Sequence, residues 1–406
     1  MQQQPAKPLV WRAAFFALRS ARIEEEMSKE QLSELRCEER TLWAPGPHAL
    51  TPSVQQVLNT YTATYTHRSS DYKACYASAA MLLKELFSIP GGFIPLIFGH
   101  TGSYNWEMVV RNTPETYLTL GMDLGAFSSK WVQVFKDSGR AIDVLPAPAG
   151  QGISTESWRE GISKSYDLAL VTHNETSSGV ALPLGEFCRI AKEISPETLL
   201  AVDGVSIAGA VEVDYTMIQP DYYLFSLQKD FSIPAIGSVM IVSERALDAA
   251  GRTRNRGYVL DLLEWTEKAR LDQTPMTVPD LTLRCLIARL EEMLAEGIDR
   301  VARHGQLAQM QRDWAAANGL KILAEPGYES PTVTAIHLPE GISGPDFVKA
   351  ASTYLNIQLA PGYGTMRDTS FRIASMGHTT VEMMTRALKG LQLILQNWEE
   401  LSRELS

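Results

Sequence analysis

Between Leu96 and Ser243 short apolar runs alternate with longer amphipathic stretches, and this alternation restricts the possible folds more than any other feature of the chain. The runs are "PLIFG", "TYLTLG", "DLALVTH", "TLLAVDG", "DYYLFSL" and "GSVMIVS". Apolar runs of this length are typical of buried strands, and parallel strands need long connections that are usually helical. We therefore predict an α/β protein with a large, mostly parallel sheet and helices on both of its faces.

The remaining sequence predicts a smaller α+β domain. Apolar residues spaced by three and four from Leu283 to Trp314 predict one long helix between the two domains. After it, "TVTAIHL" and "SFRIAS" are strand candidates, and a final helix is expected from about Val381. Near the N-terminus, Thr51 and Pro52 are typical of a helix cap followed by a first-turn proline.

These patterns divide the chain into four segments. We predict a helical extension, a segment that joins the small domain, a large domain that carries the binding site, and a linker helix with the small domain, over residues 1–40, 41–60, 61–285 and 286–406. The stretch "KPLVWRAAFFALRSAR" is basic and lacks acids, as organelle transit peptides do. The acid-rich "IEEEMSKEQLSELRCEER" after it favours a retained helix and a cytoplasmic protein, with an organellar location as the alternative.

Composition excludes several classes of partner. The net charge of -10 argues against a nucleic-acid surface, which needs clustered Lys and Arg. No apolar stretch approaches the roughly 20 residues that a membrane-spanning helix needs. The four cysteines are far apart and lack the spacing of zinc ligands, so we expect reduced thiols and no metal. We therefore expect a small molecule or a protein as partner.

Asp203 and Lys229 are the strongest candidates for chemistry. Asp203 ends the run "TLLAVDG", where a buried carboxylate needs a cation or several donors, and Lys229 follows 26 residues later, after "DYYLFSL". Ligands of such folds bind at the carboxyl ends of strands. An acid that keeps a ring nitrogen protonated and an amine that forms a Schiff base are what pyridoxal phosphate chemistry requires. The alternative is a solvated Lys229 and a structural Asp203 at a turn.

A possible phosphate site precedes this pair. In "FGHTGSYNWE" a strand leads through Gly102 and Ser103 into a helix, and such a helix start offers backbone N–H groups and a hydroxyl to a phosphate. Any helix N-cap has a similar sequence, so this motif is weak by itself.

From about Leu42 to the C-terminus the order of motifs resembles the class V aminotransferases of the fold-type I pyridoxal-phosphate enzymes. The motifs are "WAPGP", "THRSSDY", "HTGSYNWE", "THNETSSG", "AVDGVS", "SLQKD", "DQTPMT" and "GYGTMRDTSFRIASMGH". Within the class, the chain is most similar to phosphoserine aminotransferases and alanine/serine–glyoxylate aminotransferases. The resemblance implies pyridoxal 5'-phosphate as cofactor, amino acids and 2-oxo acids as substrates, and a homodimer with shared active sites.

The resemblance also implies roles at the cofactor. Lys229 would form the Schiff base and carry the proton between the substrate and the cofactor, and Asp203 would keep the pyridine nitrogen protonated. Thr176 would bind the phenolic oxygen or the adjacent ring edge. The cofactor phosphate would be bound by Gly102, Ser103 and Gln228.

Two further positions take roles at the cofactor from the resemblance. Phe127 would stack on the pyridine ring, although core packing is its alternative role and Trp131 a second candidate. Thr274 would reach the phosphate of the neighbouring subunit's cofactor, and this role requires a homodimer.

Four residues are predicted to bind the substrate. Arg372, in "SFRIAS", offers a planar fork to the α-carboxylate, with a salt bridge to a core acid as its alternative. His67 and Arg68 would bind the side-chain phosphate of phosphoserine, although the same pair occurs in relatives that use unphosphorylated amino acids. His378 is a weaker candidate for the same pocket.

The main hypothesis is a phosphoserine:2-oxoglutarate aminotransferase of serine biosynthesis. The alternative is an alanine or serine aminotransferase that uses glyoxylate or pyruvate. A lyase or desulfurase of the same fold is a third possibility, but no cysteine follows Cys285 to act as a desulfurase nucleophile. Relatives usually have a small or glycine-rich turn where this chain has Asp230 and Phe231, and often a glycine at Tyr104, so these residues put the size of the substrate in doubt.

Overall fold

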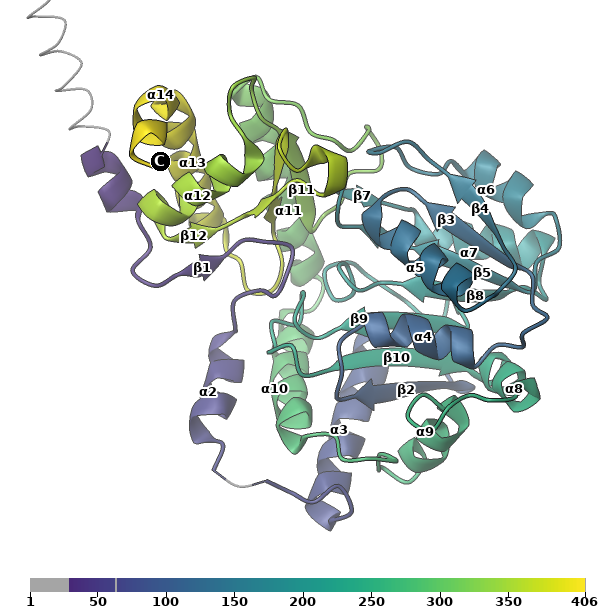
Figure 1. Ribbon diagram of the computed structural model, residues 1–406. Helices are drawn as coiled ribbons and strands as arrows, with labels where there is room; N and C mark the ends of the chain where they lie inside the picture. The colour runs from purple at the N-terminus through teal and green to yellow at the C-terminus, as the bar shows by residue number, and fades with distance from the viewer. Residues whose placement is uncertain (1–28, 63, 406) are drawn as a thin grey trace, which may run out of the picture.

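A seven-stranded sheet forms the centre of the larger part of the computed structural model, which describes residues 29–62 and 64–405 (Figure 1). Its strand order is β2-β10-β9-β8-β5-β3-β4. Only β10 runs antiparallel to its neighbours, so the prediction of a mostly parallel sheet is confirmed. The strands are β2 (Phe93–Phe98), β3 (Thr119–Asp123), β4 (Ile142–Pro146), β5 (Leu168–Thr172), β8 (Leu199–Asp203), β9 (Tyr222–Ser226) and β10 (Ser238–Ser243).

All six predicted runs form strands, whereas β4 was not predicted. Strands β5, β8, β9 and β10 are buried along their whole length, which explains why their sequences are continuously apolar. In contrast, β4 lies at the edge of the sheet, is at most half-buried, and contains Asp143. Its sequence therefore lacks the apolar run that identifies the buried strands.

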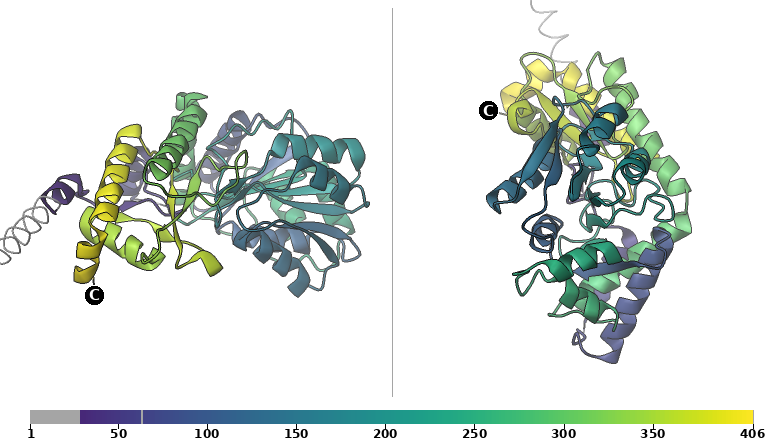
Figure 2. Two further views of the ribbon diagram at one scale, coloured as in Figure 1. Left: turned by 90° about the horizontal axis from the view of Figure 1, so that it is seen from above. Right: turned by 90° about the vertical axis from the view of Figure 1, so that its right-hand side faces the viewer.

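Helices cover both faces of this sheet (Figure 2). Thr51 caps the helix that starts at Pro52, as predicted, and its hydroxyl accepts a hydrogen bond from the Val54 N–H. The helices of this part are α2 (Pro52–Thr60), α3 (Ser70–Leu86), α4 (Ser103–Arg111), α5 (Ala126–Asp137), α6 (Thr155–Ile162), α7 (Leu184–Ile194), α8 (Glu244–Arg252), α9 (Leu262–Ala269) and α10 (Asp280–Glu296). A short hairpin of β6 (Asn174–Glu175) and β7 (Val180–Ala181) follows β5.

The smaller part is built on a three-stranded antiparallel sheet of order β11-β14-β13. Its strands are β11 (Val333–His337), β13 (Ala360–Pro361) and β14 (Ser370–Ala374). Its helices are α11 (Asp299–Ala317), α12 (Gly344–Leu355), α13 (Val381–Gln396) and α14 (Trp398–Leu401). In addition, β1 (Thr41–Leu42) pairs in parallel with β12 (Ile357–Gln358), so the segment after the N-terminal extension joins this part of the molecule.

The prediction of one long helix from Leu283 to Trp314 is wrong, because the chain forms α10 and α11 with a break between them. Gly297 has a φ of 59°, a left-handed conformation that ends α10. Ile298 precedes the first residue of α11, and 64% of its surface is exposed. The apolar spacing continued across the break, although Ile298 does not face a core.

Two large apolar cores accompany the two parts, beside a small third cluster of Val333, Ala374 and Met376. The first core contains Val54, Met293 and Ala324, and so extends beyond the domain limit predicted at residue 285. The second contains Leu32, Trp43 and side chains between Leu307 and Leu405. The domain limits themselves stay predictions.

Only the last part of the N-terminal extension is described. Residues 29–35 are helical and 36–40 are not, and Leu32 is buried in the second core. The basic stretch and the possible transit peptide lie outside the described residues. In the described part, no helix is long and apolar enough to cross a bilayer, and no group of three or more His, Cys, Asp or Glu side chains could hold a metal ion.

Candidate active site

Strands β8 and β9 bring Asp203 and Lys229 to the same edge of the sheet. The two strands pair in parallel, with Asp203 opposite Leu224, and Lys229 lies in the turn that follows β9. The Lys229 ammonium donates a hydrogen bond to the carbonyl of Pro45. Burial lowers the pKa of Lys229 to about 8, helped by the charge of Arg372 and opposed by Asp203. A lysine with this pKa has far more neutral amine near pH 7 than an exposed lysine, as a nucleophile needs.

The loop that contains Gly46 covers the Lys229 side chain. Gly46 has a φ of 84°, and a Cβ atom at this position would lie 2.3 Å from Lys229 Cδ and 2.8 Å from Nζ. Only glycine therefore permits this approach. The contact gives the "WAPGP" segment a physical role beside the lysine.

Asp203 is 6% exposed and has two firm donors. Trp106 Nε1 donates to Oδ2 at 2.9 Å, and the Val205 N–H donates to Oδ1 at 2.8 Å. Burial raises the pKa of Asp203 to about 6, although both hydrogen bonds and Lys229 oppose the shift. Trp106 was not predicted as a site residue, but it lies within the "HTGSYNWE" motif, on the first turn of α4.

The predicted phosphate-binding residues lie on two segments, the start of α4 and the turn after β9. The Gly102 N–H donates to Ser226 Oγ at 2.6 Å, and a Cβ atom on Gly102 would lie 2.4 Å from that oxygen. Ser103 is exposed at the first position of α4. The Gln228 Oε1 atom is buried and, within the described part of the chain, has no hydrogen-bond partner. A bound ligand with a donor would satisfy this oxygen.

Thr176 lies between β6 and β7, and Phe127 lies at the start of α5. The Thr176 hydroxyl donates to Ser206 Oγ at 3.0 Å, and the Phe127 ring lies 5.6 Å from the ring of Tyr363. Trp131, the second candidate for ring stacking, is fully buried and packs against Trp106. Phe127 is half-buried and so keeps part of its ring accessible, as stacking on a ligand requires.

Arg372 lies in the middle of β14 and faces acceptors that carry no charge. Its Nε donates to the Pro361 carbonyl at 3.1 Å and its Nη1 to the Thr176 carbonyl at 3.2 Å. Its guanidinium lies 5.4 Å from the centre of the Tyr363 ring. Among residues 29–62 and 64–405, no carboxylate lies within 4 Å of the Arg372 guanidinium, although the charge of Glu175 raises the pKa of Arg372 against the effect of burial. Tyr363 was not predicted as a site residue, because only the folded chain shows its contact with Arg372.

The other predicted residues have different neighbours. Arg68 donates to the Thr274 carbonyl and to Gln273 Oε1, each at 3.0 Å, and His67 Nδ1 lies 3.2 Å from Thr277 Oγ1. The Thr274 hydroxyl donates to the Met276 carbonyl at 2.7 Å. Within the described chain none of these side chains has a hydrogen bond or ion pair with Lys229, Asp203 or Arg372.

His378 lies at another surface. It is exposed and lines a small cavity of about 60 Å³ together with His48 and Thr379. This position places His378 beside the N-terminal segment, and it has no contact with Arg372 in the described part of the structure.

The central residues fit a phosphorylated pyridine aldehyde. Lys229 supplies an amine of lowered pKa, Asp203 supplies a buried carboxyl for a ring nitrogen, and Gln228 supplies a buried polar atom that needs a partner. The predicted roles of the individual residues stay predictions.

Comparison with known proteins agrees with this chemistry. The class-V aminotransferase family matches residues 95–383. A serine–glyoxylate aminotransferase of Hyphomicrobium methylovorum is 29% identical over 368 residues, which are 88% of this chain and 89% of that protein. An alanine–glyoxylate aminotransferase of Nostoc sp. has a TM-score of 0.81 at 23% identity, over 88% of this chain and 96% of that one. A phosphoserine aminotransferase of Cytophaga hutchinsonii has a TM-score of 0.78 at 23% identity, over 87% and 98%. The chain belongs to the class-V aminotransferase family and is a transaminase that uses pyridoxal 5'-phosphate.

Proposed function

We propose that this transaminase moves the amino group of a small amino acid, alanine or serine, to glyoxylate. The observation that carries the proposal is the buried Arg372 guanidinium, whose charge lowers the pKa of Lys229. Among the described residues, the hydrogen bonds of this guanidinium go to two backbone carbonyls. A substrate α-carboxylate would supply the charged partner that it lacks in the described chain. The serine–glyoxylate and alanine–glyoxylate names of two similar proteins support this choice of substrates.

The cofactor, when bound, would withdraw electrons from the substrate's Cα. Lys229 would remove the proton from the substrate's Cα and deliver it to the cofactor. Its lowered pKa would let the amine act as a base near neutral pH. Asp203 would hold a proton at the ring nitrogen with its orientation fixed by Trp106 and Val205. Arg372 would fix the carboxylate.

The rings of Tyr363 and Phe127 favour a substrate with a small side chain. Tyr363 lies against both Phe127 and the Arg372 guanidinium, so it occupies space beside the position proposed for the α-carboxylate. Lys130 donates to the Tyr363 hydroxyl at 2.5 Å and holds this ring from the other side. A bulky side chain would have to displace these rings.

Phosphoserine, our first hypothesis for the substrate, has less support. Solved structures of both substrate classes match the fold about equally well, so the fold does not separate them. The Arg68 donors that would bind the side-chain phosphate are engaged by Gln273 and by backbone carbonyls of the same chain. The homodimer and the cytoplasmic location stay part of the proposal, and sedimentation of the purified protein tests the first of them.

A panel of half-reactions tests the substrate class. We expect alanine or serine with glyoxylate to give a kcat/KM at least about 10-fold higher than phosphoserine with 2-oxoglutarate, as one charged or polar contact is worth roughly 1.4 kcal/mol or more. The readouts are the change of the cofactor absorption in each half-reaction and the formation of glycine. A higher value for phosphoserine would contradict the proposal and restore the first hypothesis.

A further inference from the structure

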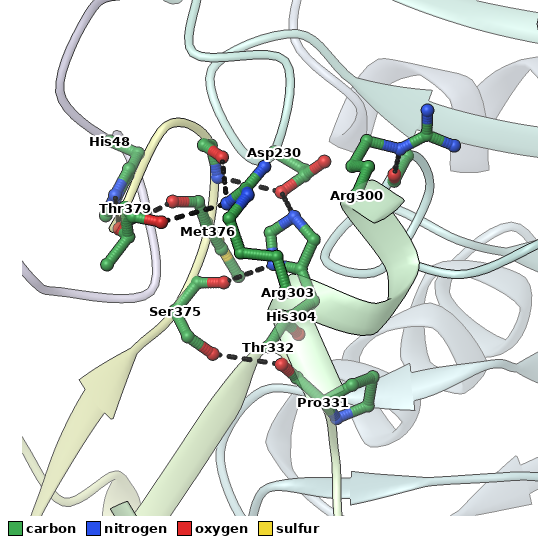
Figure 3. Close-up of polar contacts among 12 residues, drawn as sticks. His48, Asp230, Arg300, Arg303, His304, Pro331, Thr332, Ser375, Met376 and Thr379 are labelled. Carbon is green, nitrogen blue, oxygen red and sulfur yellow. Dashed lines mark hydrogen bonds and ion pairs between the residues drawn. The ribbon is translucent and has the colours of Figure 1, made fainter. Parts of the chain in front are cut away.

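A buried acid–base pair lies directly beside the lysine that binds the cofactor. Asp230 follows Lys229 in the chain, and its side chain is completely buried. Asp230 Oδ1 lies 3.2 Å from Nε2 of His304 on α11, and both side chains are 0% exposed (Figure 3). Burial lowers the pKa of His304, so this contact is an ion pair only when His304 is protonated. A carboxylate sealed from water needs hydrogen-bond donors or a charged partner.

The same carboxylate also binds the loop that follows β14. The Gly377 N–H donates to Asp230 Oδ1 at 2.8 Å. His304 extends the connection, since its Nδ1 lies 2.6 Å from the Ser375 carbonyl, to which it must donate. Asp230 and His304 therefore hold the residues immediately after β14 at two points.

Close packing reinforces these bonds. Gly377 has a φ of 61°, and a Cβ atom on it would lie 1.9 Å from Ser232 Oγ. Ser232 closes the turn that starts at Lys229, because its N–H donates to the Lys229 carbonyl at 3.0 Å. The Lys229 turn and the Gly377 loop thus touch without room for a methyl group.

These contacts connect the two groups that a substrate must reach at once. Lys229 lies next to Asp230, whereas Arg372 lies on β14, three residues before the Ser375 carbonyl that His304 binds. The two residues come from different parts of the molecule, and the α-amino and α-carboxylate groups of an amino acid are only one carbon apart. Their relative position must therefore be fixed closely, since a displacement of about 1 Å can reduce a rate about 100-fold.

We propose that Asp230 and His304 are positioning residues that fix the spacing between Lys229 and Arg372, and so select substrates that carry an α-carboxylate. This inference rests on the proposed role of Arg372. The charges around the pair are consistent with it. Arg289 and Arg300 lie near Asp230, and Arg303 lies near His304 and is itself paired with Glu296.

The test separates a change in the distance between Lys229 and Arg372 from damage to either residue alone. The Asp230→Ala variant should lower the ratio of the half-reaction rate for an amino acid to that for its amine without the carboxylate, such as alanine and ethylamine, by roughly 10- to 100-fold. Ethylamine needs only Lys229, so its slow reaction should change by less than about 3-fold. Propionate needs only Arg372, so its dissociation constant, measured by calorimetry on the holoenzyme, should also change by less than about 3-fold.

A matched control removes a buried hydrogen bond elsewhere in the small domain. Thr334 Oγ1 donates to Gln311 Oε1 between β11 and α11, without touching Asp230. Thr334→Val should lower thermal stability and leave the alanine to ethylamine ratio unchanged. The Asp230→Asn variant, which keeps an acceptor for Gly377 but loses the charge opposite His304, serves if Asp230→Ala does not fold, and should lower the ratio about 10-fold.

Two results would overturn the inference. One is a ratio in the Asp230 variants within about 3-fold of the wild-type value. The other is an equal loss in Thr334→Val, which would mean that any loosening of the small domain has this effect. The amino acid in this comparison is the best substrate of the half-reaction panel, and the amine is the same compound without its carboxylate. If the panel selects an amino acid other than alanine, the pair of compounds changes, but the comparison between the variants stays valid.

Discussion

At the scale of single residues, the cofactor lysine makes stability depend on pH. The pKa of Lys229 is lowered from 10.5 to about 8, so between these values the unfolded chain binds more protons than the folded one. Stability is therefore lost as the pH falls from about 10.5 to about 8, by on the order of 3 kcal/mol. In the cofactor-free protein this loss should be absent from the Lys229→Met variant. Urea unfolding of both proteins at several pH values measures it, and parallel curves for the two proteins would contradict the lowered pKa.

Arg372 should contribute most of the preference for a carboxylate. Arg372→Ala removes both donors and the charge, so we expect kcat/KM for alanine to fall roughly 100- to 1000-fold, while the ethylamine reaction changes little. Arg372→Lys keeps the charge and loses the planar fork, and a fall of about 10- to 100-fold is expected. Equal losses for alanine and ethylamine would instead indicate that Arg372 only supports the fold.

At the scale of elements, the loop before α2 has a role that one glycine reveals. Gly46→Ala would place a Cβ atom against Lys229, whereas Gly92→Ala, at nearly the same φ, has no atom within 4 Å of that position. Both variants should lose about 1–2 kcal/mol of stability from the left-handed backbone. Only Gly46→Ala should also weaken the visible absorption of the bound cofactor. Normal cofactor binding in Gly46→Ala, measured by that absorption, would show that the loop can move away.

Predictability also differs between elements. Strands β5, β8 and β9 could be predicted because burial on both faces makes each one a continuous apolar run. The break between α10 and α11 could not, because the apolar spacing of three and four continues through Gly297 while the backbone turns. The spacing of apolar residues predicts which side chains are buried, but it does not predict where the helix axis changes direction.

At the scale of the whole molecule, the sequence could predict the segments of the site but not the contacts between them. Lys229 and Asp203 stand at strand ends, where α/β folds bind ligands, so their position followed from the order of strands. The contact of Asp230 with His304 joins residues 74 positions apart, and Tyr363 reaches Arg372 only through the folding of the small domain. Such contacts depend on the packing of the two parts and leave no local pattern.

The tight contact of Gly377 with Ser232 has a consequence for how the enzyme discriminates between isomers. A Cβ atom on Gly377 would lie 1.9 Å from Ser232 Oγ, so the Gly377 loop and the Lys229 turn are in direct contact. On our proposal this contact helps to keep the distance between Lys229 and Arg372 constant. β-Alanine has the same composition as alanine, but its amine and carboxylate are separated by one more carbon. A fixed distance between Lys229 and Arg372 would therefore suit the spacing of amine and carboxylate in alanine but not the longer spacing in β-alanine.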